Sequence, residues 1–253
     1  MTNSNWQEFP QYHVFLTEDG SPSLKFGPTE EPMHDLKGAF SESLAIYYHP
    51  MKEVFEKFGQ LSVLSVGLGL GYNEMLFAAL LAQINNAPDG SALSSPSPDY
   101  SLYYFEKNEF LIEQFDFWLL GKTTTFQSTY DLIGSFIEKK LGIAVEEIKA
   151  QLRKCQLERR LLNLGELHLD SKAIKKCNCI LYDPFSSRTN PELWEEKFLN
   201  LFLEEFCAEN CLLTSYASKG TLKRALKNKG FVVELLPGHA GKRNRIVAWR
   251  YSC

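Results

Sequence analysis

The stretch LSVLSVGLGLGYNEML, residues 61 to 76, constrains the fold more than any other part of the chain. Its first half has large apolar side chains pointing to both faces, as expected of a strand buried inside a parallel sheet. Glycines at positions 67, 69 and 71 then form a turn, and the next dozen residues have helical periodicity. After a polar segment, YSLYYFEKN predicts a second strand that ends in an acid, Glu106. The stretch therefore begins a β-α-β unit.

The rest of the chain continues this alternation. We expect helices at residues 191–206 and 219–230, and strands near ELHL (166–169), CNCILYD (177–183), CLLTSYA (211–217), FVVELLP (231–237) and RIVAWRY (245–251). Strands that alternate with helices predict an α/β fold with a mostly parallel sheet. The last two strands are joined only by GHAGKRN, which is short enough for an antiparallel pair at the sheet edge.

Two segments lie outside this pattern. Residues 12–26 surround Asp19-Gly20 and predict a small β-hairpin, and residues 38–58 predict a lead-in helix that Pro50 divides or kinks. Dense charge with helical periodicity indicates a helical insertion at about 131–162. We therefore divide the 253 residues into an N-terminal hairpin and lead-in helix (1–50) and one principal α/β domain (51–253).

Composition narrows the class of protein. No run of about 18 apolar residues and no signal-peptide pattern is present, so we expect a cytoplasmic protein without a membrane segment. The six cysteines lack paired zinc-ligand spacing, so we expect no metal site. The net charge is −4, but from Lys219 to Arg250 nine basic residues face one acid, Glu234. This local basic character allows a nucleic-acid partner; the alternative is the solvated face of an amphipathic helix.

The glycine turn and Glu106 predict a nucleotide-like ligand. The carboxyl ends of neighbouring parallel strands meet at one edge, where a side-chain-free turn admits a ligand and an acid accepts hydrogen bonds from ribose hydroxyls. A dinucleotide fingerprint would need glycine at Tyr72, whereas G-x-G-x-G spacing is associated with S-adenosylmethionine enzymes. The turn can also be purely structural.

A second motif is LYDPFSS, in which a buried strand ends at Asp183-Pro184-Phe185. It resembles the D/N-P-P-Y/F corner of methyltransferases that act on exocyclic amines. An alkylamine is mostly protonated at neutral pH, so Asp183 would accept its proton or hold the neutral form while Phe185 packs against the base or the sulfonium. The alternative is that Asp183 only caps the helix that begins near Pro191 or hydrogen-bonds a turn.

Several stretches together resemble one family. EEPMHDLKGAFSESLAIYYHP, VLSVGLGLGYNEML, YYFEKN, LYDPFSSRTNPELW, LLTSYASKGTLKRALKNKGFVV and LLPGHAGKRNRIVAW occur in the order and approximate spacing of the MnmC-like tRNA 5-methylaminomethyl-2-thiouridine methyltransferases. The resemblance spans residues 12 to 250 apart from the inserted segments. It implies a Rossmann-like class I methyltransferase that uses S-adenosyl-L-methionine to methylate the aminomethyl group of wobble uridine in the tRNA anticodon loop. We expect a stand-alone methyltransferase whose aminomethyl precursor comes from a separate enzyme.

The resemblance and the motifs give a set of predicted site residues. Asp183 is the predicted catalytic residue. The predicted cofactor-binding residues are Gly67, Gly69, Gly71, Asn73, Glu106, Lys107, Asp170, His34 and Glu42. The predicted substrate-binding residues are Phe185, Tyr216, Lys242 and Arg243. Asp170 is preferred over Glu166 as the adenine-side acid because it follows the expected ELHL strand, and for His34 a surface-loop position is the open alternative.

Three departures from the family leave the substrate open. The chain has DPFSS where the family usually has D-G-F-[AS]-P, GHAGKRN where it has G-F-G-x-K-R, and Leu70 where it has Thr. Other possibilities are an N-methyltransferase that acts on another amine, and a non-catalytic paralogue that binds cofactor or RNA. The inserted helices either contact tRNA through their basic residues (Lys149, Arg153, Lys154, Arg159, Arg160) or cover one edge of the core.

Overall fold

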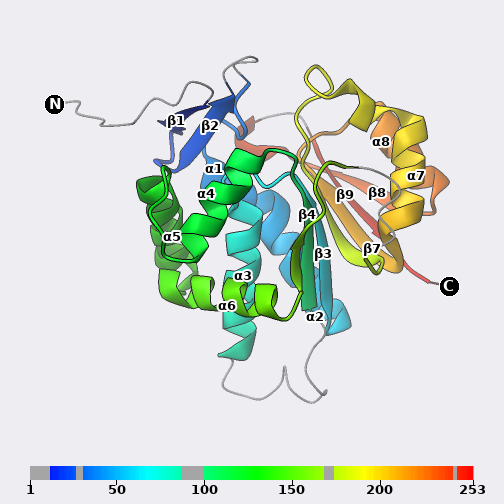
Figure 1. The fold of residues 1–253 in the computed structure, drawn as a ribbon. Helices are drawn as coiled ribbons and strands as arrows, with labels where there is room; N and C mark the ends of the chain where they lie inside the picture. The colour runs from blue at the N-terminus through cyan, green and yellow to red at the C-terminus, as the bar shows by residue number, and fades with distance from the viewer. Residues whose placement is uncertain (1–11, 27–30, 87–99, 168–173, 242–243, 253) are drawn as a thin grey trace.

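A seven-stranded sheet forms the centre of the molecule in the computed structural model (Figure 1). The structure describes residues 12–26, 31–86, 100–167, 174–241 and 244–252. The sheet strands are β3 (Leu61–Val66), β4 (Tyr100–Phe105), β5 (Leu161–Asn163), β6 (Cys177–Tyr182), β7 (Cys207–Ser215), β8 (Val232–Leu236) and β9 (Arg245–Arg250), in the spatial order β5-β4-β3-β6-β7-β9-β8. The pairs β5–β4, β4–β3, β3–β6 and β6–β7 are parallel. β9 runs antiparallel between β7 and the edge strand β8. The predicted α/β class with a mostly parallel sheet is confirmed.

Helices cover both faces of the sheet (Figure 1). The α-helices are α1 (Ala39–Ser43), α2 (His49–Phe58), α3 (Tyr72–Asn85), α4 (Glu109–Leu119), α5 (Gln127–Leu141), α6 (Val145–Leu157), α7 (Glu196–Phe206) and α8 (Gly220–Asn228). Short 3₁₀ helices follow at Pro191–Trp194 and His239–Gly241. One core cluster packs the helices from α1 through α6 against one face of the sheet, and a second packs α7 and α8 against the other face. Among the described residues, no helix is long and apolar enough to cross a membrane.

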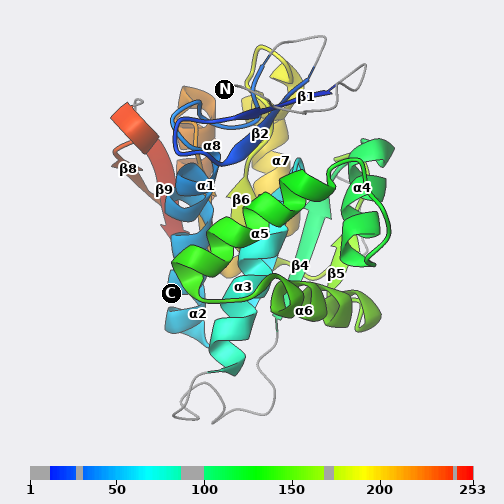
Figure 2. The ribbon, with the colours of Figure 1, turned by 90° about the vertical axis from the view of Figure 1, so that its left-hand side faces the viewer.

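The predicted hairpin is present and packs against the first helix. β1 (Tyr12–Leu16) and β2 (Pro22–Phe26) pair antiparallel, and they lie beside α1 and α5 (Figure 2). Three turn side chains accept the first backbone N–H groups of α1: Thr17 from Ala39 at 3.2 Å, and Ser21 and Asp19 from the next two residues at 2.9 and 3.2 Å. Because a helix start leaves such donors unpaired, the hairpin turn acts as the cap of α1.

The predicted lead-in helix is interrupted where proline disturbs it. A π-helical segment, Leu44–Tyr48, joins α1 to α2. In an α-helix the N–H of residue 50 would donate to the carbonyl of Ile46, but Pro50 has no N–H and its ring crowds that carbonyl. The buried Thr214 hydroxyl on β7 donates to the Ile46 oxygen instead, at 2.8 Å. The sequence prediction that Pro50 divides the helix is therefore confirmed, and the break is a π turn.

The strand expected near ELHL (166–169) lies a few residues earlier; residues 166–167 are not in a strand, and residues 168–169 lie outside the described part of the chain. In chain order, the third strand of the central sheet is β5, at Leu161–Asn163, and it pairs with β4. Gly165 has a φ of 74°, and its N–H donates to the Asn163 side chain at 3.0 Å, so the chain turns away before ELHL. Helices α5 and α6, at the predicted insertion, contribute buried residues to the core.

Candidate active site

A cavity of about 1080 Å³ opens at the carboxyl ends of the central strands. Its walls come from the turn after β3, the residues after β4, β6 and β7, and the segment between β2 and α1. Small-molecule pockets in proteins usually measure roughly 300–1,000 Å³. The cavity therefore has room for a cofactor and part of a second molecule. Of the predicted site residues, it brings together Gly67, Gly69, Asn73, Glu106, Lys107, His34, Glu42, Asp183, Phe185 and Tyr216.

The three glycines of the turn have different roles. All have positive φ, at 102°, 54° and 72° for Gly67, Gly69 and Gly71. Gly67 and Gly69 line the cavity, but Gly71 does not. A Cβ on Gly71 would lie 2.4 Å from the Phe115 ring of α4. Gly71 therefore permits close packing of α4 against the start of α3, while the other two expose backbone to the cavity.

Glu106 links the ends of the first two strands of the β-α-β unit. One carboxylate oxygen accepts the N–H of Leu68 at 3.2 Å, and the other accepts the N–H of Asn108 at 2.9 Å. Because a carboxylate has about four lone-pair positions, Glu106 keeps acceptor capacity toward the cavity. α3 begins at Gly71 with no side-chain cap, so its first N–H groups are available to an anion. These features fit the ribose and the charged end of a nucleoside-type cofactor.

The acid predicted to contact adenine is not settled by position. Asp170 lies outside the described residues, whereas Glu166 lines the cavity. Glu166 also forms an exposed ion pair with Lys107, with Nζ and Oε1 3.4 Å apart. Asn73 is buried, and its amide donates to the Ser65 hydroxyl at 3.2 Å. Asn73 thereby connects the first turn of α3 to the strand that carries the glycine turn.

The Asp183-Pro184-Phe185 corner is held by aromatic side chains. The Tyr216 hydroxyl donates to the Pro184 carbonyl at 3.0 Å, and the Trp194 indole N–H donates to the Phe185 carbonyl at 2.8 Å. The following 3₁₀ helix has Asn190 at its N-cap and no side-chain cap hydrogen bond. The N-cap residue of that helix is thus Asn190 and not Asp183, and Asp183 lines the cavity.

Two tyrosines surround Asp183 within the cavity wall. Burial and then the Asp183 carboxylate raise the pKa of Tyr47 well above its usual value, and the same two causes raise the pKa of Tyr216. Tyr216 was predicted from the sequence, but Tyr47 was not. Its signal was indirect: Pro50, three residues on, disturbs the helix that carries it.

Glu31 is a second residue that the sequence analysis missed. It lies in the segment between β2 and α1 and lines the cavity beside the corner loop. Its carboxylate accepts the Ser186 N–H and hydroxyl, both at 3.2 Å, and the Thr189 hydroxyl. Burial alone would raise the pKa of Glu31, but these hydrogen bonds lower it below the usual value. The N-terminal segment is thus tied to the loop that follows Asp183.

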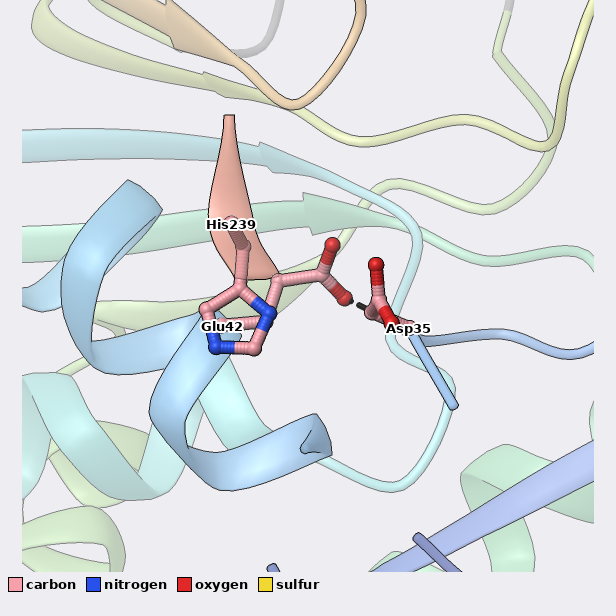
Figure 3. A group of neighbouring side chains, drawn as sticks. All are labelled: Asp35, Glu42 and His239. Carbon is pink, nitrogen blue, oxygen red and sulfur yellow. Dashed lines mark hydrogen bonds between the residues drawn. The ribbon is translucent and has the colours of Figure 1, made fainter. Parts of the chain in front are cut away.

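One acidic group beside the cavity has the residue types of a metal site. Among the described residues, ligand atoms of Asp35, Glu42 and His239 lie within 4.8 Å of one another (Figure 3). Figure 3 also shows the Glu42 carboxylate turned toward Asp35, whose N–H donates to it at 2.7 Å. The Nε2 of His239 pairs with the Ser41 hydroxyl at 3.0 Å. The group thereby fixes the β8–β9 connection to α1.

His34 occupies the same side of the cavity. It is half-buried, its Nδ1 pairs with the Ser23 hydroxyl at 3.0 Å, and its ring packs edge-on against Tyr72 with centroids 4.8 Å apart. His34 thus belongs to the loop between β2 and α1, and in that loop it lines the cavity.

Most of the described basic residues have partners within the chain. On α8, Arg224 pairs with Glu196 at 2.7 Å and Lys229 with Glu204 at 2.6 Å, as expected for the solvated face of an amphipathic helix. Lys219 lies at the corner loop, where its Nζ donates to the Ser187 hydroxyl at 2.5 Å. Lys242 and Arg243, which were predicted to bind substrate, lie outside the described residues. In the insertion, Lys149 is buried against Trp118.

Comparison with known proteins identifies the class. Residues 126–251 match the model of a family described as S-adenosyl-L-methionine-dependent methyltransferase. The solved structure of MnmC2 from Aquifex aeolicus superposes with a TM-score of 0.61 at 25% identity, and covers 95% of this chain and 71% of that chain. The chain contains an MnmC-like methyltransferase domain. It is an S-adenosylmethionine-dependent methyltransferase of the Rossmann-like class, as the resemblance implied.

The curated relatives are longer than this MnmC-like chain. An uncharacterised protein of Methanocaldococcus jannaschii is 25% identical, with 96% of this chain and 61% of that protein aligned. The bifunctional tRNA 5-methylaminomethyl-2-thiouridine biosynthesis protein MnmC of Campylobacter hominis is 23% identical, with 85% of this chain and 29% of that protein aligned. The chain thus spans less than two thirds of either relative.

Proposed function

We propose that this chain methylates the aminomethyl nitrogen of 5-aminomethyl-2-thiouridine at the wobble position of tRNA, giving 5-methylaminomethyl-2-thiouridine. One observation carries the proposal: the cavity that holds the glycine turn and Glu106 also holds Asp183 and Phe185 on a neighbouring strand end. A nucleoside-type cofactor and an amine can therefore meet in one enclosure. The MnmC relatives are named for the biosynthesis of 5-methylaminomethyl-2-thiouridine in tRNA, and this supports the choice of amine.

Each side chain has a defined part in the proposed reaction. When bound, S-adenosylmethionine supplies a methyl group on a sulfonium. Glu106 would accept hydrogen bonds from the ribose hydroxyls, and Asp183 takes the proton that keeps an alkylamine charged near neutral pH, which leaves the nitrogen lone pair to form the new N–C bond. As this bond forms, the bond between the methyl carbon and the sulfonium sulfur breaks, and its electron pair stays on sulfur, so that the cofactor would leave as the neutral thioether S-adenosylhomocysteine. Tyr216 and Trp194 fix the corner backbone by their hydrogen bonds to it, so Asp183 is held in one orientation.

The proposed substrate also fits the surroundings of the cavity. A wobble base in an anticodon loop is single-stranded, so it can be turned out and stacked on an aromatic side chain such as Phe185. Its neighbouring phosphates need cations, which Lys219 at the corner loop and the predicted pair Lys242 and Arg243 would supply. In this function a separate enzyme would expose the amine, and the reaction would take place in the cytoplasm, where tRNA is modified.

The test is methyl transfer from labelled cofactor to tRNA that carries the unmethylated aminomethyl group. The wild type should give label that RNase releases, and Asp183→Asn should lose about 10²- to 10⁴-fold in rate while its calorimetric affinity for the cofactor is kept. Asp131→Asn, on the exposed face of α5, is the matched control and should behave as wild type.

Three outcomes contradict the proposal in different ways. Label that RNase does not release, or label found only on small amines, assigns the enzyme to another amine substrate. Cofactor binding without turnover on any tRNA pool indicates a non-catalytic paralogue. Near-normal turnover of Asp183→Asn removes Asp183 from the proton-accepting role.

A further inference from the structure

The π-helical segment before Pro50 places an unexpected pair of side chains in the cavity wall. Glu42 and Tyr47 both line the cavity although five positions separate them. In an α-helix each residue advances about 100°, so such a pair would point roughly 140° apart. The π segment closes wider turns, shown by the His49 N–H donating to the Leu44 carbonyl, and this brings both side chains to one side.

The π segment is built into the core and is not a frayed turn. Pro50 removes the donor that Ile46 would use in an α-helix, and the Thr214 hydroxyl replaces it at 2.8 Å. Thr214 and the Tyr47 side chain are both buried, with 0% and 2% exposure. Thr214 lies on β7, the neighbour of β6. Because β7 supplies this hydrogen bond, the segment that carries Tyr47 is fixed to the same sheet that carries Asp183.

Tyr47 and Asp183 are neighbours in the cavity wall. The Tyr47 hydroxyl has no hydrogen bond of normal geometry to another described residue, but after burial it is Asp183 that most raises the pKa of Tyr47, through its charge and through a side-chain hydrogen bond outside that geometry. The other nearby carboxylate, Glu42, is already held by the N–H of Asp35 (Figure 3). A buried hydroxyl without a partner is costly, so its cost is relieved when the hydroxyl donates to the carboxylate beside it.

We propose that Tyr47 is a positioning residue for Asp183: the π turn presents the Tyr47 hydroxyl to the carboxylate and orients it toward the amine. The inference rests on the proposed function, in which Asp183 takes the amine's proton. In the productive complex the Tyr47 O–H donates to one carboxylate oxygen, and the other oxygen faces the substrate nitrogen. The hydrogen bond favours the ionised carboxylate, which is the form that accepts a proton.

Other described groups face this pair and set the background charge. The titratable groups that act on Tyr47, on Asp183 or on their immediate neighbours are Glu31, Glu42, Glu74, Tyr216 and Arg245. The acids among them disfavour an ionised Asp183, and a neutral hydrogen-bond donor next to Asp183 would offset this effect by stabilising the ionised carboxylate. None of these groups is changed in the variants below.

The first experiment measures Asp183 directly and needs no substrate. In protein labelled with ¹³C at aspartate side-chain carboxyl groups, the Asp183 signal is assigned by its absence in Asp183→Asn and titrated against pH. Tyr47→Phe should raise the pKa of Asp183 by about one unit, since a donor to the charged form is lost. Tyr48→Phe is the matched control: its hydroxyl lies on the same π segment but donates to Gln83, so the Asp183 titration should not move.

The second experiment follows methyl transfer against pH. For Tyr47→Phe the acid limb of kcat/KM should move up by about one pH unit, which is a tenfold loss on that limb, while the plateau at higher pH is kept. A purely structural role would lower the rate equally at every pH. An unchanged Asp183 titration in Tyr47→Phe, or an equal shift in Tyr48→Phe, overturns the inference. If the wild type methylates no tRNA, the proposed function fails, but the titration still decides the role of Tyr47.

Discussion

Glu74 offers a quantitative test of the electrostatics beneath the glycine turn. It lies in the first turn of α3 with 0% exposure, and neither side-chain oxygen has a hydrogen-bond partner in another described residue. Burial raises the pKa of Glu74 from its usual 4.5 to about 8, and the charges of Glu106 and Asp183 act in the same direction. At neutral pH the folded protein therefore keeps this carboxyl protonated.

The sign of the effect on stability follows from this shift. Because the folded-state pKa is above the unfolded one, the folded protein binds more protons between the two values, and the free energy of unfolding falls as the pH rises through this range. From pH 4.5 to pH 7 the range is about 2.5 units, so at most about 3 kcal/mol of stability is lost through Glu74 by pH 7. Above the folded pKa of about 8 the loss levels off.

The perturbation is Glu74→Gln, which keeps the shape and removes the charge. We expect the variant to match the wild type near pH 4.5 and to exceed it by up to about 3 kcal/mol at pH 7, as the glutamate desolvation cost disappears. Urea unfolding followed by circular dichroism at a series of pH values measures this difference. Glu53→Gln, on the exposed face of α2, is the control and should run parallel to the wild type. Parallel curves for Glu74→Gln would refute the reasoning.

Three further predictions concern the turn, the cofactor and metal ions. Gly71→Ala should lower the unfolding free energy by about 2–4 kcal/mol, because a left-handed φ and contact with Phe115 both oppose a side chain. Gly59→Ala also has a left-handed φ, but a side chain there would meet nothing within 4 Å, so it should cost only about 1 kcal/mol in the same urea titration. Equal losses in the two variants would contradict the packing argument. Glu106→Gln should weaken calorimetric binding of S-adenosylmethionine at least about tenfold, while Glu109→Gln, exposed on the next helix, should not. EDTA should leave methyl transfer unchanged, because the Glu42 carboxylate and the His239 ring of the group in Figure 3 are already hydrogen-bonded to the Asp35 N–H and the Ser41 hydroxyl; activity lost with EDTA and restored by a metal would show otherwise.

The parts of the site that the sequence predicts well come from one continuous segment. The glycine turn, the start of α3 and Glu106 belong to a single β-α-β unit, whose geometry is fixed by strand burial and a short list of turn residues. Asp183 lies outside this segment, but it follows β6, a buried strand that pairs parallel with β3. Since all these strands are parallel, their carboxyl ends must meet, and sequence order alone places the residues together.

The parts that the sequence does not predict depend on contacts between distant segments. The strand β5 has only three residues and is defined by pairing with β4, so local periodicity favoured the longer ELHL stretch. Glu31 binds Ser186 and Thr189 across more than 150 positions of sequence. A local pattern carries no signal for such a contact, because nothing in either segment alone requires the other.

Tyr47 lies between these two cases, and it shows why the amine half of the cavity differs from the cofactor half. Pro50 in the sequence predicts that the helix is disturbed, but a proline can produce a kink, a break or a π turn. A distant contact accompanies the π turn: the hydroxyl of Thr214, more than 160 positions away, donates to the Ile46 carbonyl, which Pro50 leaves without its α-helical donor. In the proposed reaction, placement of the amine would therefore depend on packing between the lead-in helix and β7, whereas placement of the cofactor would depend on one supersecondary unit. We expect substitutions in that packing to move Tyr47 relative to Asp183 without altering the glycine turn, so that the amine accepted would change while the cofactor stays the same.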